Sequence, residues 1–164
     1  MTHPEHSGAS PSEPGPAAPT EADVPRPPEW ADPAVILTRT GIGGFGERIG
    51  LEFLEVGPAR VVARIPVEGN TQPYGLLHGG ASVVLAETLG SIGSMLHAGP
   101  GRIAVGVDVN ATHHRAVSAG TVIGVATPIH LGSTITTYAV AITDEQDRPV
   151  CTARLTCLIR PASR

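Results

Sequence analysis

The stretch from Gln72 to Leu96 constrains the fold more than any other part of this chain. From Gly80 to Leu96 the residues are apolar or small, and Glu87 is the one charged side chain among them. This composition is typical of a helix that other structure covers on most sides. A carboxylate in that setting requires an explanation, because burying an unpaired charge is costly. The alternative is that Glu87 lies on a narrow exposed strip, as surface glutamates commonly do.

Glycines surround the expected start of this helix. His78, Gly79 and Gly80 stand at the beginning of the apolar run. A helix N-terminus presents unpaired backbone N–H groups and a partial positive charge, and glycines let another molecule approach closely. Such a start can hold an anion or polarise a carbonyl oxygen. A plain glycine-rich loop fits these residues equally well, but with Glu87 two turns further on the pattern indicates an acyl-transfer site.

Length, charge and cysteine content narrow the class of protein. The 164 residues fit one domain with an extension, and the net charge of -4 argues against a general nucleic-acid binder. No apolar run approaches the roughly 20 residues that span a bilayer, and the N-terminus lacks the basic start and apolar core of a signal peptide. Cys151 and Cys157 share one face of an expected strand but lie too far apart to bridge. We therefore expect free thiols in a cytoplasmic protein.

The N-terminal part divides into a tail and the beginning of a domain. Residues 1–28 are rich in Pro, Ala, Ser, Gly and Glu and have too little apolar surface to fold, so we expect a disordered tail followed by one domain over 29–164. A short helix is expected within Glu29–Thr40. The GIGGFG run at 41–46 matches a dinucleotide-binding pattern, but a helical pattern precedes it and a strand pattern follows. We expect a flexible turn there that borders a pocket.

The rest of the chain has the alternating pattern of strands. Gly50–Val56 and Ala59–Val67 predict a hairpin that turns at Gly57-Pro58. After the helix, four more strands are predicted: Ile103–His113, Thr121–His130, Thr134–Thr143 and Pro149–Ile159. Short connections favour an antiparallel sheet, and one long helix against one sheet predicts an α+β domain in which the sheet wraps the helix.

This order of elements resembles the hotdog fold, and the motifs resemble one branch of it. QPYGLLHGGA at 72–81 with LAE at 85–87 is similar to the PaaI-like acyl-CoA thioesterases. Within them it is most similar to the 1,4-dihydroxy-2-naphthoyl-CoA and 4-hydroxybenzoyl-CoA thioesterases that use a glutamate on the central helix. VNATHHR at 109–115 and HLGS at 130–133 match in kind and order. The resemblance covers roughly residues 45–160.

The resemblance implies roles for five residues. Glu87 matches the catalytic carboxylate, either as nucleophile or as general base toward water, and the Gly79 N–H matches the group that polarises the thioester carbonyl. Gln72 and His78 match residues that support the thioester end. Ser91, one turn after Glu87, matches a polar neighbour that holds the water or orients the acid. The resemblance further implies a homodimer in which Glu87 and Gly79 of one site come from different subunits, with dimers pairing into homotetramers.

Coenzyme A would be part of the substrate, and no metal or other cofactor is expected because a thioester is already activated. Its phosphates call for arginine, histidine, hydroxyl and backbone N–H groups. The candidates are His113, His114, Arg115, Ser133, Thr134 and Arg160. Adjacent residues of a strand point to opposite faces, so at most one of the two histidines faces the ligand. Ordinary surface charge explains the arginines equally well. His97 is expected at the helix C-terminus, where it would interact with the dipole.

Three other functions fit parts of the pattern. A non-catalytic acyl-CoA-binding protein of the same fold would not need Glu87, His78 and Ser91. A hydratase or dehydratase would need an Asp/His pair that does not accompany this helix start. A metallohydrolase would have to assemble histidines that lack the spacing of metal ligands: His78, His113, His114 and His130. We therefore expect a thioester hydrolase acting on an aromatic or other small acyl-CoA, an acyl group suggested by the resemblance alone.

Overall fold

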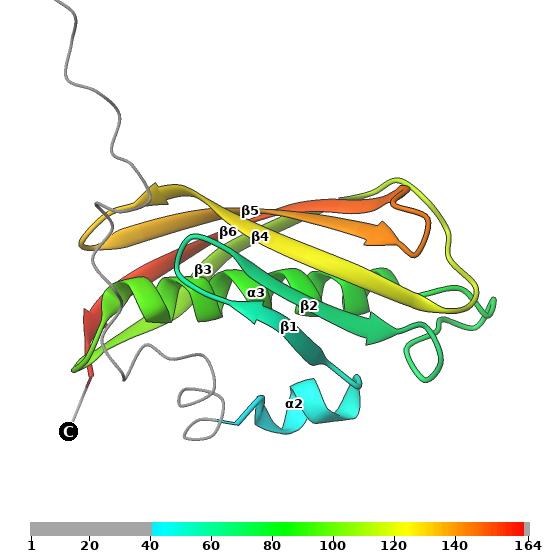
Figure 1. Cartoon of the computed structure of the whole chain (residues 1–164), viewed down its shortest axis with the longest axis horizontal. Coiled ribbons are helices and arrows are strands. Elements are labelled where there is room, and N and C mark those ends of the chain that lie inside the picture. Colours follow the sequence, from blue (N-terminus) through cyan, green and yellow to red (C-terminus); the bar gives the residue numbers. More distant parts are fainter. Residues whose placement is uncertain (1–40, 163–164) are drawn as a thin grey trace, which may run out of the picture.

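The computed structural model describes residues 41–162 as one antiparallel sheet with a long helix lying across one of its faces (Figure 1). The strands are ordered β1-β2-β4-β5-β6-β3, and every pair is antiparallel. The elements along the chain are α2 (Gly43–Arg48), β1 (Glu52–Val56), β2 (Val61–Pro66), α3 (Gly79–Ala98), β3 (Arg102–His113), β4 (Thr121–Leu131), β5 (Ile135–Asp144) and β6 (Pro149–Pro161). This is the predicted α+β hotdog fold, with the helix and the strands close to the expected positions.

The core lies between α3 and the face of the sheet on which it packs. Leu85 and Leu89 of α3 are fully buried, and each contributes about 1.5–3 kcal/mol through burial. Gly124 of β4 makes this close approach possible, because a Cβ at that position would lie 2.6 Å from Leu89 Cδ1. Tyr138 of β5 is also fully buried, and its hydroxyl donates a hydrogen bond to the carbonyl of Pro58 at 2.6 Å. Cys151 and Cys157 are buried free thiols, as predicted.

Strand β3 is an edge strand whose second side pairs with no other strand among the described residues. It is 12 residues long, and a bulge between Gly106 and Asp108 interrupts its register with β6. Val105 and Val107 are 41% and 59% exposed. A long edge with exposed apolar side chains is a template for pairing with another strand.

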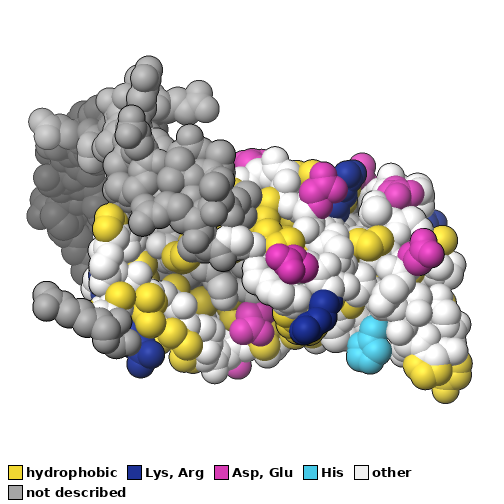
Figure 2. Space-filling view, turned by 90° about the horizontal axis from the view of Figure 1, so that it is seen from below, with side chains coloured by type: hydrophobic (Ala, Val, Ile, Leu, Met, Phe, Trp, Pro, Cys, Tyr) yellow, Lys and Arg dark blue, Asp and Glu magenta, His cyan; other side chains and the backbone are white. Residues whose placement is uncertain are grey.

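Two expectations about helices need correction. The long helix is not covered on most sides: the sheet covers one face, and Glu87 is exposed on the other. Seen from below the view of Figure 1, hydrophobic side chains also reach the surface (Figure 2). The glycine run at 41–46 does not form only a turn, because α2 begins at Gly43. Gly41 and Gly43 do have positive φ angles, so within this run the left-handed geometry lies just before α2 and at its first residue.

Helix α3 is also longer than the apolar run from Gly80 to Leu96 that predicted it. Helix α3 has 20 residues and is long and apolar enough to cross a membrane by length and composition. Half of this apolar segment of α3 is buried inside the domain, as expected for a core helix that packs against a sheet. The expected tail over 1–28 and the expected helix within Glu29–Thr40 lie outside the described residues.

Candidate active site

The loop before α3 is held in one conformation by hydrogen bonds from three directions. The side-chain amide of Asn70 donates to the carbonyls of Ile49 and Pro66, at 2.8 and 2.9 Å. The N–H of Leu77 donates to the carbonyl of Val117 at 2.7 Å, and the N–H of His78 donates to the carbonyl of Asn70 at 2.8 Å. The start of the helix is therefore fixed relative to both β2 and the segment that follows β3.

His78 is the N-cap of α3 and determines which backbone N–H remains available. Its Nδ1 accepts a hydrogen bond from the N–H of Gly80 at 2.8 Å, so a neutral His78 carries its proton on Nε2. The N–H of Gly79 has no acceptor among the described residues. Gly79 thus presents an unpaired donor at the positive end of a 20-residue helix. The sequence missed this capping role of His78.

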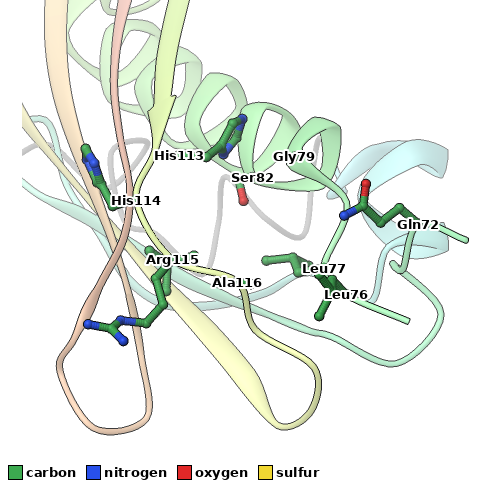
Figure 3. Close-up of a pocket in the computed structure, with 10 residues that line it drawn as sticks. Gln72, Leu76, Leu77, Gly79, Ser82, His113, His114, Arg115 and Ala116 are labelled. Atoms are coloured by element: carbon green, nitrogen blue, oxygen red, sulfur yellow. The ribbon is translucent and has the colours of Figure 1, made fainter. Parts of the chain in front are cut away.

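A cavity of about 410 Å³ opens at this helix start (Figure 3). It brings together several predicted residues with some that were not predicted: Gln72, Leu76, Leu77, Gly79, Ser82, His113, His114, Arg115, Ala116 and Val150. The ring of His113 lies against Gly79, because a Cβ built on Gly79 would be 2.8 Å from His113 Nε2. Ser82 follows Gly79 by three residues and shares its helix face, a spacing from which its position could have been predicted.

Both adjacent histidines line this cavity, although only one of them was expected to face the ligand; their side chains nevertheless diverge. His113 points toward the helix start, whereas Nε2 of His114 lies 2.9 Å from the hydroxyl of Thr152 (Figure 3). Arg115 lines the same cavity, but its guanidinium extends away from Gly79. His113 therefore lies nearer to the expected position of the thioester than to a phosphate site, which the sequence did not indicate.

Glu87 and Ser91 lie in a different place, on the exposed face of α3. They line a cavity of about 340 Å³ together with Phe45, Val84, Thr88 and Ile92. Glu87 also borders the edge strand, since a Cβ built on Gly106 would be 3.0 Å from Glu87 Oε1. Phe45 and Val84 also line a neighbouring cavity that reaches His78 and Gly80. A mostly apolar groove therefore runs along this face of the helix, and its border by the 41–46 segment was predicted.

The remaining predicted residues are at the far end of α3. Ser133 and Thr134 form the turn between β4 and β5, and Arg160 is near the end of β6, opposite Ile103 at the start of β3. All three are exposed. Within one chain, the candidate coenzyme A residues therefore form two separate groups. His113, His114 and Arg115 lie near the start of α3, and Ser133, Thr134 and Arg160 lie beyond its end.

Known proteins resemble this chain along most of its described length. The sequence model of one protein family, the thioesterase superfamily, matches residues 74–151. The proofreading thioesterase EntH of Cronobacter turicensis is 45% identical over 124 residues, which are 75% of this chain and 90% of the relative. The chain belongs to the thioesterase superfamily. It is a thioester hydrolase with a hotdog fold, and the predicted enzyme class is confirmed.

Solved thioesterase structures superpose on this superfamily member. One from Haemophilus influenzae is 39% identical with a TM-score of 0.69, covering 71% of this chain and 82% of its own. A thioesterase variant from Pseudomonas aeruginosa is 38% identical with a TM-score of 0.73, covering 77% of this chain and 93% of its own. A Staphylococcus aureus thioesterase is 29% identical with a TM-score of 0.70, covering 73% of this chain and 100% of its own. It was solved with a glutamine replaced and, separately, with a glutamate replaced fifteen positions later.

Proposed function

We propose that this chain hydrolyses aromatic, hydroxybenzoyl- or naphthoyl-like, or other small acyl-CoA thioesters in the cytoplasm, with Glu87 and Gly79 as its central catalytic groups. The observation that carries the proposal is an unpaired helix-terminal N–H beside Gln72 and His113, combined with an exposed carboxylate at the open edge of the sheet. The first group can polarise a thioester carbonyl, and the second can attack it or activate water.

These two groups of one chain cannot act on the same carbonyl. Glu87 follows Gly79 by eight residues, which separates them by about 12 Å along the helix axis. Attack requires the reacting atoms to be about 3–3.5 Å apart. In addition, the two residues line different cavities. A complete site therefore requires Glu87 from one chain and Gly79 from another.

The edge strand supplies a geometry for that pairing. In each chain Glu87 borders Gly106, and Gly79 borders His113 at the end of the same strand. Antiparallel pairing of two β3 edges, about an axis between residues 109 and 110, places Gly106 opposite His113 of the partner subunit. Glu87 then lies near Gly79 of the partner subunit, and the unpaired backbone groups along the β3 edge become hydrogen-bonded. The site would form twice in a homodimer, and further pairing would produce a homotetramer.

The same symmetry reunites the two groups of coenzyme A residues. Two α3 helices related in this way run antiparallel, so the end of one lies toward the start of the other. Ser133, Thr134 and Arg160 of one chain then approach the end of the molecule where the partner presents His113 to Arg115. The substrate would extend from phosphates at these exposed groups to a thioester between Glu87 and the partner's Gly79. Its acyl group would occupy the groove beside Phe45 and Val84.

The remaining polar residues assist the reaction in this arrangement. Gln72 and His113 flank the Gly79 N–H and hold the thioester end of the substrate. Ser91 lies one turn after Glu87 in the same cavity, where it can hold the attacking water or orient the carboxylate. Gln72 and Glu87 are fifteen positions apart, the separation of the two residues that were replaced in the Staphylococcus aureus thioesterase. This match supports assigning them to one site.

The test is thiol release from a panel of benzoyl, hydroxybenzoyl, phenylacetyl, naphthoyl and fatty acyl-CoAs, with wild type, Glu87→Ala and Glu87→Gln. We expect both variants to lose at least about a hundredfold in kcat. Glu87 is exposed and has no ion pair among the described residues, so the free energy of unfolding should change by no more than about 0.5 kcal/mol. Near-normal turnover by a folded Glu87→Ala protein would overturn the assignment. An acyl group trapped on Glu87 after rapid quenching would identify it as the nucleophile.

A further inference from the structure

The turn between β4 and β5 lies over the C-terminal end of α3 (Figure 1) and is held there by three elements. Nε2 of His97, in the last turn of α3, lies 3.1 Å from the carbonyl oxygen of Gly132. The guanidinium of Arg102, at the start of β3, donates to the carbonyl of Ser133 at 2.5 Å. The N–H of Ile159 in β6 donates to the carbonyl of Thr134 at 2.7 Å. Three successive carbonyls thus have donors from three separate parts of the chain.

This arrangement determines what the turn presents on its other side. The N–H groups of Ser133 and Thr134 have no acceptor among the described residues, and both residues are exposed. The turn is also tight, because a Cβ at Gly132 would lie 2.6 Å from His130 Nε2 and 2.7 Å from the carbonyl oxygen of Ile135. With its three carbonyls already bonded, the turn keeps two unpaired N–H donors that suit an anion.

The surroundings favour an anion as well. The nearby basic side chains are His97, Arg102, His130 and Arg160, and none of them forms an ion pair with an acid within residues 41–162. A carbonyl oxygen only accepts hydrogen bonds, so Nε2 of His97 must carry a proton to bind Gly132. Without these two side-chain donors, the turn would keep only its backbone bonds.

We propose that His97 and Arg102 are positioning residues: they hold the β4–β5 turn so that its N–H and hydroxyl groups bind a phosphate of the coenzyme A portion of the substrate. This rests on the proposed function, which assigns Ser133 and Thr134 to that phosphate. His97 and Arg102 act through the carbonyls of Gly132 and Ser133. Their removal should therefore weaken binding of the nucleotide end of the substrate and leave the chemistry at Glu87 unchanged.

The experiment compares two thioesters that share one acyl group, an acyl-CoA and the corresponding acyl-pantetheine, which lacks the phosphates. For His97→Ala and Arg102→Ala, we expect the KM for acyl-CoA to rise about tenfold and kcat to stay within about twofold of wild type. The KM for acyl-pantetheine should not change. A purely structural defect would affect both substrates alike, and that result would overturn the proposal.

Neutral donors separate positioning from direct attraction by charge. His97→Gln keeps an N–H donor at about the reach of Nε2 without a charge, so it should restore a KM for acyl-CoA close to wild type. A glutamine variant as defective as His97→Ala would mean that charge at the phosphate, and not the hydrogen bond to the turn, is responsible. The matched control is Arg64→Ala, which removes an exposed arginine that pairs with Glu52 on the first hairpin. It should leave both KM values unchanged.

Inhibition by the free thiols gives a second readout that does not depend on acyl-pantetheine turnover. The inhibition constant of coenzyme A should rise with the KM of acyl-CoA in the alanine variants, and that of pantetheine should not. Equal inhibition constants for coenzyme A in wild type and variants would overturn the positioning role while leaving thioester hydrolysis intact. A wild-type chain that hydrolyses no thioester would instead refute the proposed function itself.

Discussion

A methyl group at Gly79 tests the proposed carbonyl-binding group directly. Gly79 has no left-handed φ angle, so the backbone accepts alanine, and alanine is favoured over glycine in a helix by up to about 1 kcal/mol. The new Cβ would lie 2.8 Å from Nε2 and 3.1 Å from Cε1 of His113, so the ring must move. His113 is exposed, and displacing its side chain costs about 0.5–1.5 kcal/mol. The two contributions nearly cancel in the free energy of unfolding.

The effect on turnover should be much larger. The methyl group and the displaced ring would occupy the space through which a carbonyl oxygen reaches the Gly79 N–H. Loss of one such donor lowers kcat by about 10²–10³. We therefore expect the free energy of unfolding of Gly79→Ala to lie within about 1 kcal/mol of the wild-type value. At saturating acyl-CoA, the variant should hydrolyse the substrate at least about a hundred times more slowly than wild type. Urea unfolding and thiol release measure the two quantities.

Gly93→Ala is the matched control for Gly79→Ala, because it adds the same methyl group at a buried position of α3. Its Cβ would lie 2.7 Å from Cε1 and Cζ of Tyr138, a buried ring that its hydrogen bond to Pro58 holds in place. Overpacking of this kind costs about 1–3 kcal/mol, so this variant should lose stability while its folded fraction keeps a normal kcat. Wild-type turnover by Gly79→Ala would refute the role of the Gly79 N–H. A loss of more than about 2 kcal/mol in Gly79→Ala would show that the reasoning about its packing is wrong.

Two further predictions concern stability. Burial raises the pKa of Asp144, but hydrogen bonds from Arg148 and from the N–H of Gln146 outweigh it and hold this pKa below its ordinary value. The ionised carboxylate therefore stabilises the fold above about pH 4, and this stabilisation is lost as pH falls through the lower pKa of the folded state. Asp144→Asn should lower the urea midpoint at pH 7 and converge with wild type in acid; a constant difference between the two at all pH values would contradict this. Ser94 accepts a buried hydrogen bond from Thr136 at 2.8 Å, so Ser94→Ala should cost about 1–3 kcal/mol by leaving the Thr136 hydroxyl unpaired. Adding Thr136→Val should recover part of that loss in urea unfolding, whereas strictly additive losses would refute the coupling.

Local patterns predicted most of the framework. The strands and α3 lie close to their expected positions because the periodicity of apolar residues follows from the geometry of each element. The segment at 41–46 was predicted less well, since α2 contains three glycines and its helical conformation is not a local preference. The sequence also indicated the capping histidine without indicating its role, because the bond from Gly80 to Nδ1 depends on the rotamer of His78.

The position of Glu87 is where sequence and tertiary structure divide most clearly. The sequence predicts one carboxylate two turns into an apolar helix, one turn from Ser91, after a glycine-rich start. The packing of the folded chain adds that the sheet covers the opposite face, that Glu87 is exposed beside the edge strand, and that Glu87 lies apart from the Gly79 N–H. The same packing places His97 and Arg102 against the carbonyls of the turn after β4. Periodicity specifies the faces of a helix, but which face is covered, and by what, depends on contacts between residues far apart in the chain.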